Sequence, residues 1–104
     1  MYEFEKTDEF KEWLKSLNKN IRSDITQRID HATAERLGKT LKGTGGLSEI
    51  VMDTGPGYRL YYCRETNTKY WLLFGGIKKN QPYDIKQAQD IHKDLKRSDY
   101  GKTD

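Results

Sequence analysis

Residues 47–74 have the sequence LSEIVMDTGPGYRLYYCRETNTKYWLLF, in which three segments of alternating side chains are separated by two short, turn-rich ones. The segments cover residues 47–53, 58–64 and 69–74, and they are rich in aromatic and aliphatic residues, as strands are. The connections, residues 54–57 and 65–68, have hairpin length and contain Gly, Pro, Asn and Thr. This stretch therefore predicts three consecutive antiparallel strands.

The segments on either side complete an α+β fold. Residues 2–6 alternate as a short strand does, and from Asp8 onward apolar residues recur every three to five positions, as in two amphipathic helices. The bend between these helices is expected at residues 17–20, and the second helix is expected to stop at Gly38. After the three strands, Pro82 opens a last helix. The predicted order is β-α-α-β-β-β-α, with one domain over residues 1–97 and a flexible tail over residues 98–104.

Composition limits the function classes. The chain has 104 residues, a mean hydropathy of −1.01 and apolar runs of at most five residues, too short for a membrane span. Its start is acidic and lacks the apolar stretch of a secretory leader, and its single cysteine, expected in the core, cannot form an internal disulfide. We therefore expect a cytoplasmic protein with no membrane partner.

Charge is distributed unevenly along the chain. Residues 1–14 carry a net charge of −3, and the rest carries +6. A basic remainder is compatible with a polyanionic partner, although solvated basic faces would give the same pattern.

Several short motifs carry no site. Gly38-Lys39-Thr40 lacks the first glycine of a phosphate-binding loop, because position 33 is Thr. His31 and His92 fall on separate predicted helices, both are expected at the surface or its boundary, and only one cysteine accompanies them. The sequence thus predicts no metal and no cofactor.

One group of polar residues converges on the predicted sheet. Strand alternation divides the side chains of the first two strands between the two faces. On one face it places Ile50, Met52, Leu60 and Tyr62, and on the other Glu49, Val51, Asp53, Arg59, Tyr61 and Cys63. If the helical pair covers the aliphatic face, the polar face is expected to be partly open, since only one short helix is left to cover it. Lys78 would reach this face from the loop after the last strand.

A guanidinium, an ammonium, a phenol and a carboxylate together suit cleavage of an RNA backbone. Arg59 would stabilise charge on the phosphate, Glu49 or Lys78 would take the proton of the ribose 2′-OH, and a Tyr or Lys would protonate the leaving 5′-oxygen. The alternative is a cross-strand ion pair between Glu49 and Arg59 with no chemistry.

Four motifs resemble one known family. They are Leu-Ser-Glu-Ile at 47–50, Gly-Pro-Gly-Tyr-Arg-Leu-Tyr-Tyr at 55–62, Leu-Leu-Phe-Gly-Gly-x-Lys at 72–78 and Gln-x-x-Asp-Ile-x-x-Ala at 81–88. Together with Phe-x-x-Trp-Leu-x-x-Leu at 10–17, they look like the addiction-module killer proteins. These are phage-related toxins of type II toxin-antitoxin modules in the RelE/ParE superfamily, close to the HigB branch.

The resemblance implies a helix-turn-helix antitoxin as partner and ribosome-dependent cleavage of mRNA. The candidate catalytic residues are those carried over from the motifs, together with Tyr61 from the strand alternation: Arg59, Lys78, Glu49, Tyr58 and Tyr61. The candidate RNA-binding residues are Arg36, Lys39, Lys42, Lys79 and Gln81.

Two positions depart from the family pattern. Val51 stands where members commonly have Arg, and Ile77 stands where they commonly have Asp. Two other functions therefore remain open. One is a ParE-like toxin that acts on DNA gyrase without cutting RNA, and the other is a catalytically weakened module that binds an antitoxin.

Overall fold

The computed structural model describes residues 2–34 and 38–102. Its helices and strands confirm the predicted α+β order. They are β1 (Glu3–Lys6), α1 (Asp8–Lys15), α2 (Lys19–Ala34), β2 (Lys39–Thr40), β3 (Ser48–Met52), β4 (Tyr58–Arg64), β5 (Lys69–Ile77), the 3₁₀ helix η1 (Lys78–Asn80) and α3 (Gln81–Arg97). The two-residue β2 is absent from the sequence prediction, because so short a strand carries no period-two pattern.

Within the described ranges, five strands form one sheet in the order β1-β5-β4-β3-β2. The pairs β2·β3, β3·β4 and β4·β5 are antiparallel, whereas β1 lies parallel to β5 at one edge. The short strand predicted at residues 2–6 therefore pairs within this sheet, at its β5 edge. In register, Glu49 faces Tyr61, Val51 faces Arg59, and Arg59 faces Gly76.

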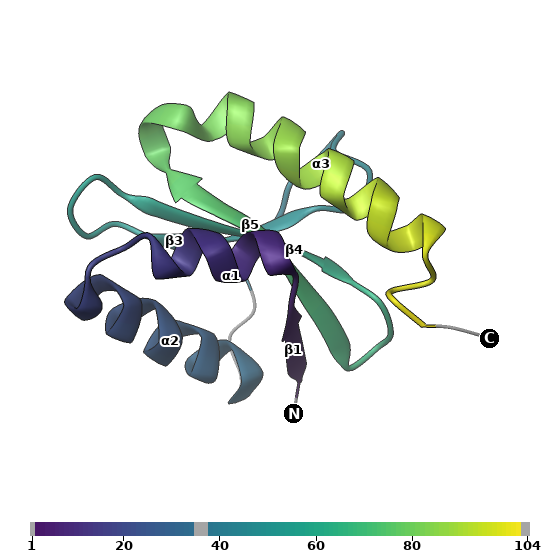
Figure 1. Ribbon diagram of the computed structural model, residues 1–104, viewed down its shortest axis with the longest axis horizontal. Coiled ribbons are helices and arrows are strands. Elements are labelled where there is room, and N and C mark those ends of the chain that lie inside the picture. Colours follow the sequence, from purple (N-terminus) through teal and green to yellow (C-terminus); the bar gives the residue numbers. More distant parts are fainter. Residues whose placement is uncertain (1, 35–37, 103–104) are drawn as a thin grey trace.

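Helices cover both faces of the sheet (Figure 1). On one face, α1 and α2 bury a core with β4 and β5 that includes Phe10, Ile25, Leu60 and Leu72. On the other face, α3 packs its apolar side, including Ala88, on a second core. This core contains Leu47, Tyr61, Cys63 and Leu73.

The expectation of a partly open face is wrong over most of its length. Helix α3 has 17 residues, which span about 25 Å, so it is long enough to cover that face rather than one corner of it. Tyr61, expected on the open face, is fully buried beneath it. The β3–β4 turn, whose residues 53–56 are exposed, lies at one end of this face and is joined to η1, just before α3.

Side chains cap the starts of the first two helices, and one of these caps also bonds the sheet. The hydroxyl of Thr7 accepts the backbone N–H of Phe10 at 3.1 Å, which caps α1, and donates to the carbonyl of Leu73 at 2.7 Å. Asn18 caps the start of α2 in the same way, because its Oδ1 accepts the N–H of Ile21 at 3.0 Å. Thr7 therefore fixes the start of α1 relative to β5, and Asn18 fixes where α2 begins along the chain.

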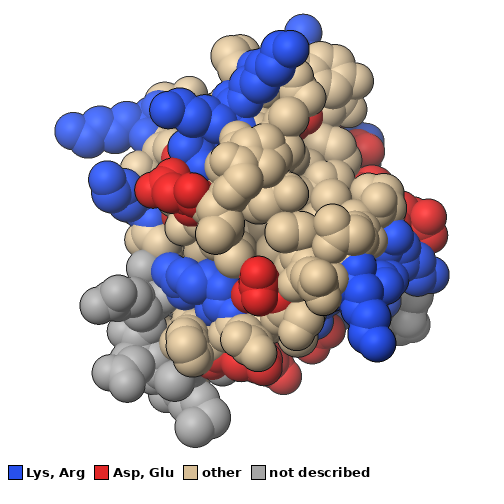
Figure 2. Space-filling view, turned by 90° about the vertical axis from the view of Figure 1, so that its left-hand side faces the viewer, with Lys and Arg blue, Asp and Glu red and all other residues tan. Residues whose placement is uncertain are grey.

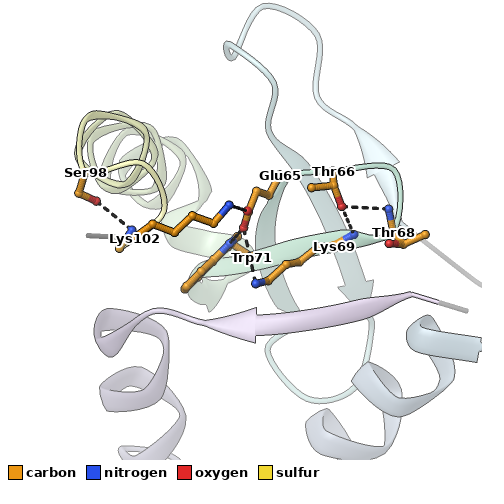
Figure 3. Close-up of polar contacts among 8 residues, drawn as sticks. Glu65, Thr66, Thr68, Lys69, Trp71, Ser98 and Lys102 are labelled. Atoms are coloured by element: carbon orange, nitrogen blue, oxygen red, sulfur yellow. Dashed lines mark hydrogen bonds and ion pairs between the residues drawn. The ribbon is translucent and has the colours of Figure 1, made fainter. Parts of the chain in front are cut away.

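Residues 98–102 fold back against the β4–β5 hairpin (Figure 3). Glu65 lies at the centre, with its side chain only 4% exposed. Trp71 Nε1 donates to Glu65 Oε1 at 2.7 Å, and Lys102 Nζ donates to Oε2 at 2.6 Å. The ring of Tyr100 lies 6.4 Å from that of Trp71. The expected flexibility of residues 98–104 stays a prediction, but these contacts hold residues 98–102 in a defined path.

We expect Glu65→Gln to destabilise the fold by about 1 to 2 kcal/mol at pH 7, because a charged acceptor of two hydrogen bonds is lost. The bond from Lys102, and then that from Trp71, lowers the pKa of Glu65 in the folded chain. Its contribution is therefore present above the unfolded pKa of about 4.3 and is lost as the pH falls through the folded pKa. Urea unfolding at pH 7 and at lower pH measures both effects.

Glu12→Gln is the matched control, since Glu12 is an exposed acid on α1. Its unfolding free energy should change by less than about 0.5 kcal/mol. An equal loss in both variants would mean that overall charge, rather than the Glu65 contacts, accounts for the effect.

Candidate functional site

The β3–β4 turn brings two basic side chains together. Residues 54–57 close a turn in which the N–H of Gly57 donates to the carbonyl of Thr54 at 3.0 Å. The carbonyl of Gly57 then accepts the N–H of Lys78 at 2.8 Å, which joins the turn to η1. A Cβ added to Gly57 would lie 3.3 Å from Lys78 Cβ and 3.4 Å from Arg59 Nη1. Lys78 and Arg59 therefore flank one glycine, whose φ of +77° also disfavours a side chain.

Arg59 is held by acids and by its own strand. Only 7% of the residue is exposed, and its Nε lies 3.6 Å from Glu49 Oε1. Its Nη1 lies 3.8 Å from Asp53 Oδ1 and donates to the carbonyl of Tyr58 at 3.2 Å. These contacts fix the plane of the guanidinium.

Glu49 is itself fixed by the start of α3. Gln81 Nε2 lies within hydrogen-bond distance of both carboxylate oxygens, at 3.2 and 3.3 Å. Glu49 is 7% exposed, so this carboxylate faces Gln81 and Arg59 rather than solvent. Gln81, expected to bind RNA, thus contacts the carboxylate that pairs with the Arg59 guanidinium.

Two buried oxygens beside this cluster lack hydrogen-bond partners in the described part of the chain: Tyr61 Oη and Asp84 Oδ2. Burial raises the pKa of Tyr61, and the nearby charges of Glu49 and Asp84 raise it further. Burial also raises the pKa of Asp84. The Tyr61 hydroxyl is therefore a neutral group in the second core and is inaccessible to a substrate.

The other candidates are spread more widely. The Tyr58 ring belongs to the first core and lies 6.5 Å from that of Trp13, on the sheet face opposite Arg59. Lys39 is exposed on β2, Lys42 in the following turn and Lys79 on η1. Arg36 lies outside the described residues. The structure thus brings together Arg59, Lys78, Glu49 and Gln81 and leaves the other candidates apart.

Figure 2 views the side on which the β3–β4 turn and the start of α3 lie. Lys and Arg side chains stand around the rim of this face, with Asp and Glu groups between them and a largely uncharged middle. Val51, which faces Arg59 in register, is 37% exposed. The position where the family pattern has Arg is therefore beside the guanidinium and open to a ligand.

Sequence reasoning assigned no role to two acids at the site. Asp53 lies at the solvent side of Arg59, with its side chain 86% exposed, and strand alternation had already placed it on that face. Asp84 fits against Gly76, where an added Cβ would overlap Asp84 Oδ2. Only its spacing from Gln81 marked it in the sequence, and spacing does not reveal that contact.

The two histidines and the one cysteine of the chain lie in the part that the structure describes. No group of three or more His, Cys, Asp or Glu side chains there could hold a metal ion. Cys63 is buried, as predicted, and burial raises the pKa of its thiol to about 12. His31 is exposed as expected, but His92 is only 7% exposed, because the loop before β3 packs beside it. Among the described helices, none has the length and apolarity to cross a membrane.

Comparisons with known proteins agree with this fold. The model of the family described as "Phage derived protein Gp49-like (DUF891)" matches residues 12–96. An uncharacterised protein of Haemophilus influenzae is 35% identical over 88 residues, which are 83% of this chain and 88% of the relative. The solved structure of a mutant of the E. coli toxin RelE in the free state superposes with a TM-score of 0.63 at 16% identity, covering 79% of this chain and 90% of RelE.

Proposed function

The chain belongs to the Gp49-like family of phage-derived proteins and has the RelE fold, and from this premise we propose that it is the toxin of a type II toxin-antitoxin module and cleaves mRNA on the ribosome. The partner that restrains it would be an antitoxin with a helix-turn-helix domain. The predicted membership in the RelE/ParE superfamily is confirmed by the family match and the fold.

One observation carries the proposed chemistry: the largely buried Arg59 and the exposed Lys78 flank Gly57, next to the exposed residues 53–56 of the β3–β4 turn. A phosphodiester placed over this glycine would meet a guanidinium on one side and an ammonium on the other. The planar guanidinium can donate two hydrogen bonds to phosphate oxygens as charge develops on them. The stabilisation that it provides is larger where water is largely excluded. Glu49 and Gln81 keep that guanidinium in place.

The reaction needs two proton transfers. The 2′-oxygen attacks the phosphorus and its proton passes to a carboxylate, while the bond from phosphorus to the 5′-oxygen breaks and that oxygen receives a proton. The products are a 2′,3′-cyclic phosphate and a 5′-hydroxyl. Lys78, which is exposed, would supply the proton to the 5′-oxygen.

Asp53 is the better candidate for the proton acceptor. Its carboxylate is exposed and 3.8 Å from Arg59 Nη1, whereas the Glu49 carboxylate is buried against Gln81 and Arg59. A base has to reach the proton that it removes, which favours the accessible carboxylate. We therefore give Glu49 a positioning role. Tyr58 and Tyr61 take no part, because their side chains lie in the two cores.

Binding to the ribosome would use the exposed lysines. Lys39, Lys42 and Lys79 are exposed on separate elements, and contacts from such side chains to phosphates add affinity without reading sequence. Codon preference would then come from the geometry at the cleavage site rather than from these lysines.

Primer extension on mRNA in a translating extract tests the proposal. Added wild-type protein should produce new 5′ ends within translated codons, and it should do so only while ribosomes are moving. In cells that express the protein, growth arrest with intact mRNA and loss of DNA supercoiling would instead support a toxin that acts on gyrase. Absence of both effects would reduce the protein to an antitoxin-binding module.

A further inference from the structure

A cavity lies at the other end of β4 from Arg59. The pairing of β3 with β4 stops at Ser48 opposite Tyr62, whereas β4 continues to Arg64. Before Ser48 the chain turns away through Gly45 and Gly46, both at positive φ, and Gln89 of α3 donates to the carbonyl of Thr44 at 3.2 Å. The departure of this loop from the sheet leaves a cavity of about 620 Å³.

The charged residues that line this cavity are basic. Arg64 and Lys96 line it, and no Asp or Glu occurs among its described lining residues. Both basic residues are exposed, and neither forms an ion pair within the described ranges. The cavity therefore presents two uncompensated positive charges to whatever enters it.

A buried imidazole lines the same cavity. His92 is only 7% exposed, and its side chain forms no hydrogen bond within residues 2–34 and 38–102. Burial, and then the charge of Lys96, lowers its pKa, which keeps a neutral ring with one donor and one acceptor nitrogen. Its ring nitrogens are not among the fully buried polar atoms that lack a partner, so they keep contact with the cavity and can bond a ligand there.

A hydrogen bond and a glycine shape two of the walls of this cavity. The Tyr62 hydroxyl accepts the N–H of Gly38 at 2.8 Å, which holds one wall. A Cβ on Gly46 would lie 3.6 Å from His92 Cε1, so glycine keeps this space open. Tyr100, partly exposed, offers a phenol ring at the same cavity.

We propose that this cavity binds one phosphate of an RNA strand, with the adjoining sugar or base against His92 and Tyr100. The proposal rests on the proposed function in one respect, because RNA is the polyanion that such a toxin meets. RNA is favoured over an acidic protein segment because single-stranded nucleic acid is bound by positive charge combined with aromatic rings. Arg64 lies five positions along β4 from Arg59, about 17 Å, so the two ends would bind different phosphates.

Titration with a 2′-O-methyl oligoribonucleotide tests the inference, since that probe lacks the 2′-OH needed for cleavage. In ¹⁵N-labelled wild-type protein, we expect amide shifts at Gly45 and Gly46 and changes at the His92 ring. Arg64→Gln/Lys96→Gln should weaken binding about tenfold in low salt and lower the slope of log K against log salt by about 0.7 for each phosphate that the variant no longer neutralises.

The matched control is Lys86→Gln/Lys93→Gln, which removes the same charge from exposed positions of α3 outside the cavity lining. It should retain the shifts at Gly45, Gly46 and His92. Equal losses in the two double variants, or shifts confined to Gly57 and Lys78, would overturn the inference. So would poly-glutamate or inorganic phosphate binding the cavity as tightly as the oligonucleotide. Because no cleavage is measured, failure here is distinguishable from failure of the proposed nuclease activity.

Discussion

Arg59→Lys is expected to slow mRNA cleavage about 10²- to 10³-fold while the protein stays folded. Lysine keeps the positive charge beside Glu49, but it loses the planar pair of donors that matches phosphate oxygens. Primer extension with dilutions of both proteins in one translating extract gives the ratio of rates. Cleavage by the variant at the wild-type rate would remove Arg59 from the chemistry.

Variants that remove the charge of Arg59 distinguish its role in folding from its role in catalysis. Arg59→Gln leaves Glu49 buried without its cation, which should cost about 3 kcal/mol of unfolding free energy. Adding Glu49→Gln should restore most of that stability, because the two neutral amides no longer bury an unpaired charge. The double variant should fold and still fail to cleave. A double variant that cleaves would show that Arg59 matters only for stability.

Tyr61→Phe is the control for the other candidate on the same strand. Its hydroxyl is buried without a partner, so its loss should leave cleavage within about twofold of wild type and stability unchanged or slightly higher. A large fall in cleavage with unchanged stability would return Tyr61 to the catalytic group.

Strand alternation predicted correctly which side chains share a sheet face, because a hairpin turn and a two-residue period together fix this. It correctly separated Leu60 and Tyr62 from Arg59 and Tyr61. It could not say which face is open, since that depends on where a distant helix packs. A signal was nevertheless present, because Cys63 and Leu73 are apolar residues on the supposedly open face.

The contacts between the sheet and α3 could not be predicted from the sequence. The bonds from Gln81 to Glu49 join residues 32 positions apart, and they exist only because α3 starts beside the β3–β4 turn. The sequence marked Gln81 only as a residue that binds RNA, which stays a prediction, and it did not reveal the contact with Glu49. The convergence of Lys78 with Arg59 likewise depends on one backbone bond between η1 and the turn.

Gly76→Ala is expected to be among the most damaging single substitutions, with a loss of about 3 kcal/mol of unfolding free energy. The added methyl would overlap Asp84 Oδ2 and lie 2.7 Å from its Cγ, so Asp84 and the first turn of α3 have to move. Gln81 is on that turn, so its bond to Glu49 should break and Arg59 should lose its position. Urea unfolding and primer extension measure the two consequences.

Asp84→Ala provides the test of cause, since it removes the carboxylate that the methyl would strike. Its own cost should be small, because the raised pKa of Asp84 marks a carboxylate whose charge burial disfavours. In that background Gly76→Ala should cost less than about 1 kcal/mol, a coupling far above the scatter of additive pairs. If the cost stays near 3 kcal/mol, the obstruction lies in the backbone of α3. If cleavage survives while stability falls, the start of α3 supports the fold without positioning Arg59.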